Sequence, residues 1–85
     1  MKRLKNNRIT VIMPVYNRTE YLEDAIQSVL NQTYSEYELI IVDDGSTNPE
    51  IKEVLKKYKI HPRVEIFFRT HKGPGEAINF GAKKV

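Results

Sequence analysis

Residues 39–46 read Leu-Ile-Ile-Val-Asp-Asp-Gly-Ser and indicate the centre of a sheet. The apolar run, rich in β-branched side chains, is typical of a strand buried on both faces of a parallel sheet. Asp43 and Asp44 follow where that strand ends, and ligands of open α/β sheets bind at the carboxyl ends of the strands. The same residues are also common in a simple turn before a helix cap. The sequence around them has to distinguish a binding site from a turn.

Two more apolar runs predict two more strands. Residues 9–13 are rich in β-branched side chains, and Pro14 is expected to end that strand because proline donates no hydrogen bond to a sheet. Residues 64–68 form the other run, in which the charge of Glu65 favours a position toward the edge of the sheet.

A helix is expected after each strand. Thr19 is a candidate N-cap of the first helix, and the acidic residues after it complement the helix dipole. This helix should end near Asn31, with residues 32–35 as the connection back to the sheet.

The second and third helices have clear start signals. Thr47 or Asn48 can cap the second helix, with Pro49 at its first position. A polar, glycine-bearing loop at residues 69–75 leads into the third. That helix is expected to run to the last residue, and it carries small residues that allow close packing, at Ala77, Gly81 and Ala82.

The predicted order is therefore β-α-β-α-β-α. This order builds an α/β fold with a three-stranded parallel sheet and helices on both faces, which is half of a doubly wound, Rossmann-like nucleotide-binding domain. A chain of 85 residues is at most one small domain. We expect residues 1–8 to be frayed, and the third helix lacks a stop signal, which indicates a truncated architecture.

The composition is that of an ordinary globular protein, with 40% hydrophobic residues, 29% charged residues and a net charge of +3. Much of the positive charge lies near the two ends, which favours solvated termini or, alternatively, attraction to an anionic membrane surface or an acidic partner. No basic stripe is interleaved with aromatic residues, which argues against nucleic acid as a partner. The absence of cysteine excludes disulfides, and no apolar run is long enough to span a membrane. We predict a cytoplasmic location, with the cytoplasmic face of a membrane as an alternative.

Residues 14–18 and 43–46 should meet at one edge of the sheet, because each segment follows a parallel strand. Tyr16 offers a flat face on which a base can stack, and a neighbouring carboxylate can accept hydrogen bonds from a base or a ribose. This pair of groups predicts a nucleoside pocket. The alternative for Tyr16 is a half-buried side chain that fills the strand exit.

Asp43 and Asp44 could instead hold Mg²⁺. Adjacent strand residues point to opposite faces, so the two carboxylates can share an ion only if the backbone turns between them. We therefore expect one aspartate to face the ligand and the other to hold loop amides.

The loop His71-Lys72-Gly73-Pro74-Gly75 brings cationic side chains to a helix N-terminus, where a diphosphate could bind. The loop is neither a Walker loop nor a dinucleotide fingerprint, which argues against P-loop and NAD-dependent enzymes. An ordinary connection is the alternative for this loop.

Four segments share a pattern with a known enzyme family. They are residues 11–18, residues 21–22 with 25–34, residues 38–47 (Glu-Leu-Ile-Ile-Val-Asp-Asp-Gly-Ser-Thr), and Gly73-Pro74-Gly75 followed by Ala77, Asn79 and Gly81. In this order they resemble the family 2 glycosyltransferases, which are inverting enzymes with a GT-A fold. The resemblance covers nearly the whole chain from Ile9, and it departs at Ile78, where the family often has an arginine.

The resemblance implies transfer of a sugar from a nucleoside diphosphate sugar, often a UDP-sugar, to an acceptor hydroxyl with inversion. By the resemblance, Tyr16 lies against the base, Asp44 hydrogen-bonds the base, and Asp43 and the residues around Pro14 shape the pocket. The expected nucleotide-binding residues are Pro14, Tyr16, Asn17, Asp43, Asp44 and Gly45, with His71, Lys72 and Gly73 as diphosphate contacts.

The family has two further elements past the third helix. An acidic D-x-D-type motif holds Mg²⁺ or Mn²⁺ on the diphosphate, and a carboxylate general base deprotonates the acceptor, which would be a saccharide, a lipid-linked group or another hydroxyl compound. Residues 1–85 would then be the truncated N-terminal nucleotide-sugar-binding half of a catalytic domain, without catalytic or metal-binding residues and inactive alone. Its open sheet edge and uncovered helix surface favour self-association.

Two other classes of function stay open on the sequence. A non-catalytic nucleotide-binding or interaction module would use the same pocket. A metal-dependent nucleotidyl-transfer domain would use Asp43 and Asp44 as ion ligands, and metal titration against an Asp44→Ala variant would test that reading.

Overall fold

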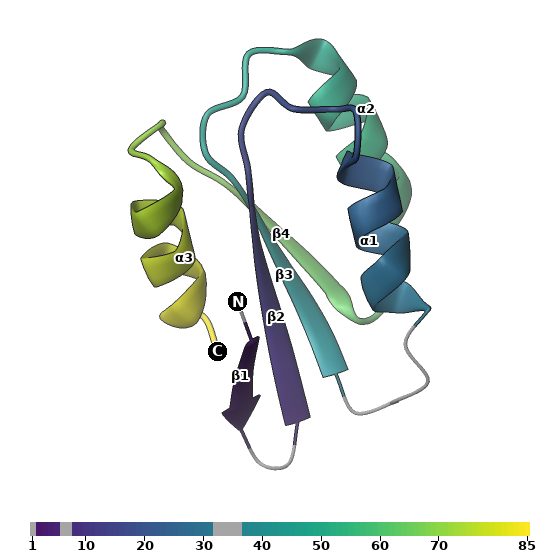
Figure 1. Cartoon of the computed structure of the whole chain (residues 1–85), viewed down its shortest axis with the longest axis vertical. Coiled ribbons are helices and arrows are strands. Elements are labelled where there is room, and N and C mark those ends of the chain that lie inside the picture. The colour runs from purple at the N-terminus through teal and green to yellow at the C-terminus, as the bar shows by residue number, and fades with distance from the viewer. Residues whose placement is uncertain (1, 6–7, 32–36) are drawn as a thin grey trace.

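The computed structural model describes residues 2–5, 8–31 and 37–85, and the connection expected at residues 32–35 lies outside them. One four-stranded sheet has helices on both faces (Figure 1). The elements in chain order are β1 (Lys2–Lys5), β2 (Arg8–Val15), α1 (Leu22–Leu30), β3 (Tyr37–Asp43), α2 (Pro49–Tyr58), β4 (Val64–Phe68) and α3 (Pro74–Ala82). No helix among the described residues is long and apolar enough to cross a membrane.

The three predicted strands form a parallel sheet, with β3 between β2 and β4. Residue Ile41 of β3 pairs with Met13 on one side and with Ile66 on the other. Leu39 and Ile41 are 0% exposed, as expected for a strand covered on both faces. The α/β prediction is confirmed, and the strand that contains Glu65 lies at an edge of the described sheet.

A fourth strand, β1, was not predicted. It runs antiparallel to β2, with Lys2 opposite Val11 and Lys5 opposite Arg8. The expectation of a frayed terminus is therefore wrong for the described residues of this segment, whereas residues 1, 6 and 7 lie outside the description. A periodic pattern of apolar residues indicates which side chains are buried. Backbone pairing needs only an N–H and a C=O, which residues of any polarity have. A charged segment can therefore form a strand without an apolar pattern.

Strand β2 continues through Pro14 to Val15, although Pro14 was expected to end it. The carbonyl of Val15 accepts a hydrogen bond from the amide of Asp44 at 2.8 Å, so Val15 turns its backbone groups toward β3. The backbone groups of successive strand residues point to alternate sides, so those of Pro14 point away from β3. On that side the described pairing with β1 extends only to Val11. A residue without an N–H is tolerated at such an edge position.

Two apolar cores lie on opposite faces of the sheet. Helices α1 and α2 cover one face and α3 covers the other (Figure 1). The first core comprises Val15, Leu22, Ile26, Leu39, Ile41, Ile51, Leu55, Tyr58 and Val64. The second comprises Ile40, Val42 and Ala77, with Phe67, Phe80 and Val85 packed against it.

The helix starts agree with the sequence prediction for α2 but not for α1. Asn48 caps α2 by accepting a hydrogen bond from the amide of Glu50 at 3.0 Å, and Pro49 is the first residue of the helix. Helix α1 begins at Leu22 without a side-chain cap; Thr19 contributes its carbonyl oxygen, 3.3 Å from the amide of Leu22. The N-cap residue is Tyr21, so the prediction that Thr19 caps this helix is wrong.

Small residues let α3 lie close to the sheet, as predicted. A Cβ on Gly81 would lie 2.6 Å from Cγ2 of Ile12, and Ala77 is 0% exposed. The helix ends at Ala82 rather than at the last residue, and Lys83 occupies its C-cap.

Candidate functional site

The candidate site is formed by the loops that follow β2, β3 and β4. These loops lie at the same end of the sheet, at the top of Figure 1. Val15 pairs with Asp43, and the amide of Asp44 donates to the carbonyl of Val15 at 2.8 Å. The prediction that residues 14–18 and 43–46 meet at one edge is therefore confirmed.

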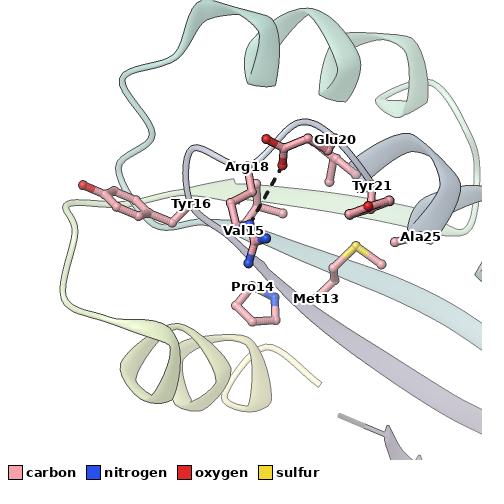
Figure 2. A pocket seen from close by; sticks show the side chains of 9 residues that line it. Met13, Pro14, Val15, Tyr16, Arg18, Glu20, Tyr21 and Ala25 are labelled. Atoms are coloured by element: carbon pink, nitrogen blue, oxygen red, sulfur yellow. Dashed lines mark ion pairs between the residues drawn. The ribbon is translucent and has the colours of Figure 1, made fainter.

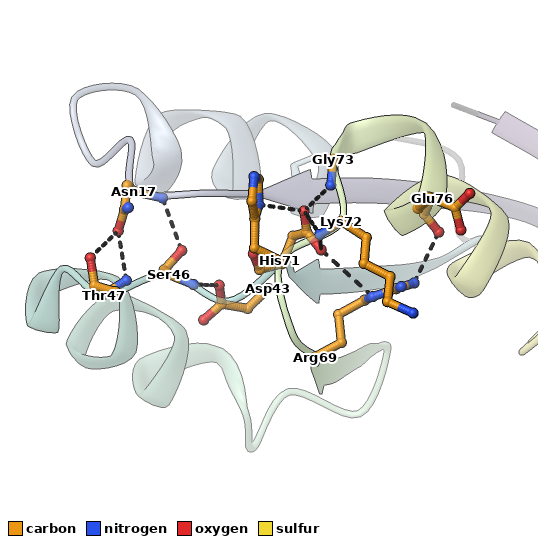
Figure 3. Close-up of polar contacts among 10 residues, drawn as sticks. Asn17, Asp43, Ser46, Thr47, Arg69, His71, Lys72, Gly73 and Glu76 are labelled. Atoms are coloured by element: carbon orange, nitrogen blue, oxygen red, sulfur yellow. Dashed lines mark hydrogen bonds and ion pairs between the residues drawn. The ribbon is translucent and has the colours of Figure 1, made fainter.

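Asn17 joins the first of these loops to the second (Figure 3). Its Oδ1 accepts hydrogen bonds from the amides of Thr47 and Asn48 at 2.8 and 2.9 Å, and its own amide donates to Oγ of Ser46 at 2.9 Å. Its φ of 56° lies in the left-handed region, which asparagine tolerates better than most residues. Asn17 thus shapes the site by holding the β3–α2 loop, and a direct contact with a nucleotide stays a prediction.

Asp43 is 2% exposed and holds the start of the same loop. Its Oδ1 accepts from the amide of Ser46 at 3.0 Å, and its carbonyl accepts from the amide of Arg69 at 2.9 Å. The side-chain bond to a nearby amide is the arrangement by which aspartate stabilises turns. Asp43 therefore connects the ends of β3 and β4.

Asp44 is 1% exposed and holds the β4–α3 loop. Its carboxylate accepts from the amide of Lys72 at 3.0 and 3.1 Å and from the amide of Gly73 at 2.7 Å. Nε of Arg69 lies 3.6 Å from Oδ1. Both aspartates hold loop amides, and the expectation that one of them also faces a ligand stays a prediction. A carboxylate enclosed by a folded-over loop requires such donors, because an unpaired buried charge is costly.

The charge of Asp44 follows from these contacts. Burial by itself would raise the pKa of Asp44, but the amides of Gly73 and Lys72 and the ring of His71 stabilise the carboxylate, and the net pKa is lowered from its ordinary value. Asp44 is therefore an anion at neutral pH.

His71 lies between Asp44 and Tyr16. Its Nδ1 is 2.9 Å from Oδ2 of Asp44 and 3.2 Å from the backbone oxygen of the same residue. Both neighbours are acceptors, so Nδ1 carries a proton. The imidazole stacks on the ring of Tyr16, with centroids 3.9 Å apart and an interplanar angle of 21°. One face of the aromatic platform predicted for a base is thus covered by a residue of the chain itself.

Gly45 lets the loops after β3 and β4 approach each other. Its φ is +79°, and a Cβ at this position would lie 2.7 Å from the backbone nitrogen of His71 and 3.2 Å from the backbone oxygen of Arg69. Only a residue without a Cβ fits both constraints. Gly45 thus has a structural role within the expected nucleotide site.

Two hollows flank these loops. A cavity of about 300 Å³ lies beside β2 and is lined by Met13, Pro14, Tyr16, Arg18 and Tyr21, among others (Figure 2). Another of about 480 Å³ lies at the ends of β3 and β4 and is lined by Asp43, Gly45, Ser46, Lys52 and Arg69, among others. Of the predicted nucleotide residues, Pro14 and Tyr16 line the first hollow and Asp43 and Gly45 line the second, whereas Asp44 lines neither.

Arg69 and Ser46 are site residues that sequence reasoning did not single out. Arg69 has a side chain only 14% exposed, and its Nη1 donates to the backbone oxygen of Glu76 at 3.0 Å, which ties the start of α3 to the loop (Figure 3). One feature of the sequence could have indicated Arg69 as a site residue: it directly follows a predicted strand, as Asp44 does. Ser46 lay within the marked turn, but its bond to Asn17 joins residues 29 apart in the chain.

A divalent metal does not fit the described side chains. The described residues contain no group of three or more histidine or carboxylate side chains placed to hold an ion. The carboxylates of Asp43 and Asp44 are each turned toward amides of different loops. They do not converge on the shared ion of the metal-dependent alternative.

Comparison with known proteins identifies the family. The family described as Glycosyl transferase family 2 matches residues 10–85. An uncharacterized glycosyltransferase of Rickettsia bellii is 42% identical over 95% of this chain, and one of Haemophilus influenzae is 46% identical over 91%. The chondroitin synthase of Escherichia coli is 37% identical over 84% of the chain. The chain spans 12%, 31% and 10% of the lengths of these three proteins. Because the family match extends over nearly all of its length, this chain belongs to glycosyl transferase family 2.

Proposed function

We propose that this chain is the nucleotide-binding part of a glycosyltransferase that uses a nucleoside diphosphate sugar, specifically a UDP-sugar, and transfers the sugar to an acceptor hydroxyl with inversion. The observation that carries the proposal is the meeting of Tyr16, Asp44 and the loop at His71 at the carboxyl ends of adjacent parallel strands. Membership of the family supports glycosyl transfer. The name of the Escherichia coli relative supports a saccharide among the acceptors.

Four of the expected site residues have a direct role in this proposal. The ring of Tyr16, which is 43% exposed, stacks on the base, and Pro14 forms a wall of the adjoining cavity. Asp44 contributes a charged acceptor for the base and keeps the β4–α3 loop in position. The exposed side chain of Lys72 is the cation that we assign to the diphosphate, whereas the amides of Lys72 and Gly73 are already used by Asp44.

The metal and the general base of the reaction belong to segments outside residues 1–85 in this proposal. Bound on the diphosphate, the metal would neutralise the leaving group. The described residues bind and orient the nucleotide, and they supply neither of these groups.

Tyr16→Ala is expected to weaken UDP binding about tenfold, because stacking of a base on an aromatic ring contributes about 1–3 kcal/mol. Tyr16→Phe keeps the ring and should bind within about twofold of the wild type. Isothermal titration calorimetry on the folded chain measures both. Equal affinities for the wild type and Tyr16→Ala would contradict the stacking role, and no binding of UDP at all would contradict the proposed function.

The chain by itself is expected to transfer no sugar, because the described residues form no group placed to hold a metal ion and the general base lies outside residues 1–85 in this proposal. Incubation with radiolabelled UDP-sugars and saccharide acceptors should give no more labelled product than the background from hydrolysis of the UDP-sugar. Chondroitin synthase serves as the positive control that the assay detects sugar transfer. Product formed by residues 1–85 alone would refute this expectation.

A further inference from the structure

His71 makes the two contacts that the proposed function assigns to a base. Its ring stacks on Tyr16 at a centroid distance of 3.9 Å, and its protonated Nδ1 lies 2.9 Å from Oδ2 of Asp44. A flat ring that presents an N–H to a carboxylate is also the chemistry of a nucleobase edge. The imidazole therefore occupies the position on Tyr16 and Asp44 that a stacked base would need.

The remaining contacts of Asp44 leave no other acceptor position open. Oδ1 faces the amide of Lys72 at 3.0 Å and Nε of Arg69 at 3.6 Å, and Oδ2 accepts from the amide of Gly73 at 2.7 Å. The carboxylate is 1% exposed. A base can reach it only if one donor leaves. Two of the donors are side chains, and the ring of His71 is the more exposed of them, at 49% against 14% for Arg69, whose Nη1 is also bonded to the backbone oxygen of Glu76.

The side chain of His71 has a route away from the site. It is 49% exposed, and its contacts with Tyr16 and Asp44 are made by the ring. Rotation about its side-chain bonds therefore takes the ring into water. The amides of Lys72 and Gly73 keep the loop on Asp44 while this happens.

We propose that the imidazole of His71 is a placeholder that the nucleobase displaces. The base then lies on the face of Tyr16 that the imidazole covered, and its N–H donates to Oδ2 of Asp44. This inference rests on the proposed nucleotide-binding function. It makes His71 a residue that lowers the affinity for the nucleotide, because the base has to replace the contacts that the imidazole already makes with Tyr16 and Asp44. A placeholder also keeps Asp44 paired when no nucleotide is present.

The test compares UDP binding by the wild type, His71→Ala and the matched control His61→Ala. His61 is the other histidine of the chain, and its ring accepts from the amide of Arg63 at 3.1 Å, in the connection between α2 and β4. Calorimetry should find UDP bound about tenfold more tightly by His71→Ala than by the wild type, because a hydrogen bond to a charged group no longer has to be replaced. His61→Ala should bind UDP as the wild type does.

Free imidazole gives a second readout. It should compete with UDP for His71→Ala, where it can fill the space that the side chain left, and it should not change UDP binding by the wild type. Nuclear magnetic resonance spectra of the wild type should show the ring signals of His71 shift toward those of an exposed histidine as UDP is added. The ring signals of His61 should stay unchanged.

Weaker or equal UDP binding by His71→Ala would overturn the placeholder role, since a loss of affinity would make His71 a second stacking surface for the base. If Tyr16→Ala loses UDP while His71→Ala matches the wild type, the proposed function stands and the placeholder is refuted. Failure of the wild type and of every variant to bind UDP would refute both. Should His71→Ala not fold, as judged by circular dichroism, the wild-type ring signals decide: unchanged His71 signals at saturating UDP overturn the proposal.

Discussion

Replacing Asp44 with asparagine is expected to lower the free energy of unfolding by about 3 kcal/mol, because a buried charged acceptor is lost. The carboxylate accepts from the amides of Lys72 and Gly73, and it also faces Arg69 and His71. The amide group of asparagine keeps the shape but turns an NH₂ toward these donors. Urea unfolding followed by circular dichroism measures the loss, and faster amide exchange at Lys72 and Gly73 would locate it in the β4–α3 loop.

The stability difference between the wild type and Asp44→Asn should also depend on pH. The pKa of Asp44 is lowered in the folded chain. A lowered folded-state pKa stabilises the protein fully above the ordinary aspartate pKa of about 3.9, and this contribution is lost as the pH falls through the lowered value. The difference should therefore be constant near neutral pH and shrink on acidification. A difference that grows on acidification would contradict the assignment of the charge.

Asp24→Asn is the matched control for Asp44→Asn. Asp24 lies on α1 and is exposed, so its replacement removes the same charge without removing a buried acceptor. Its unfolding free energy should stay within about 0.5 kcal/mol of the wild type. If Asp44→Asn were as stable as Asp24→Asn, the carboxylate of Asp44 could not be what holds the loop.

Gly45→Ala is the second large effect, with an expected loss of about 3 kcal/mol in the free energy of unfolding. Part of the loss comes from a left-handed φ of +79°, which a residue with a Cβ rarely adopts. The larger part comes from the backbone of His71, whose nitrogen would lie 2.7 Å from the new Cβ. A backbone atom cannot rotate away as a flexible side chain can, so the loops after β3 and β4 have to separate. Thermal and urea unfolding measure the effect.

Gly75→Ala is the matched control for Gly45→Ala. Gly75 lies in α3, and a Cβ there would meet nothing within 4 Å. Alanine is also the better helix former, so the variant should be as stable as the wild type or slightly more stable. Equal stability of the two variants would rule out the close approach of the loops.

The order of elements could be predicted because it depends on short-range patterns. The apolar run before Asp43 and the Asn48-Pro49 pair indicate a buried strand and a helix start, and both are found. The position of Asp44 at a strand end follows from that order. The strand β1 escaped prediction, because it contributes backbone pairing instead of an apolar pattern. Self-association at the edge strand β4, where Phe68 is 57% exposed, stays a prediction.

The partners of the site residues could not be predicted in the same way. The amides that bind Asp44 are 28 and 29 residues away in the chain, and no local pattern links a strand end to a loop at that distance. The sequence predicted that one aspartate holds loop amides, but not that the carboxylates of both accept hydrogen bonds from amides.

The amino-acid sequence alone therefore determines the family, the parallel order of the sheet and the group of residues at its carboxyl edge, because apolar periodicity and turn residues act over a few positions. The stack of His71 on Tyr16 and the enclosure of Asp44 are decided only by the tertiary structure. They arise where three loops meet, and the hydrogen bonds that a buried carboxylate requires come from whichever donors the fold brings to it.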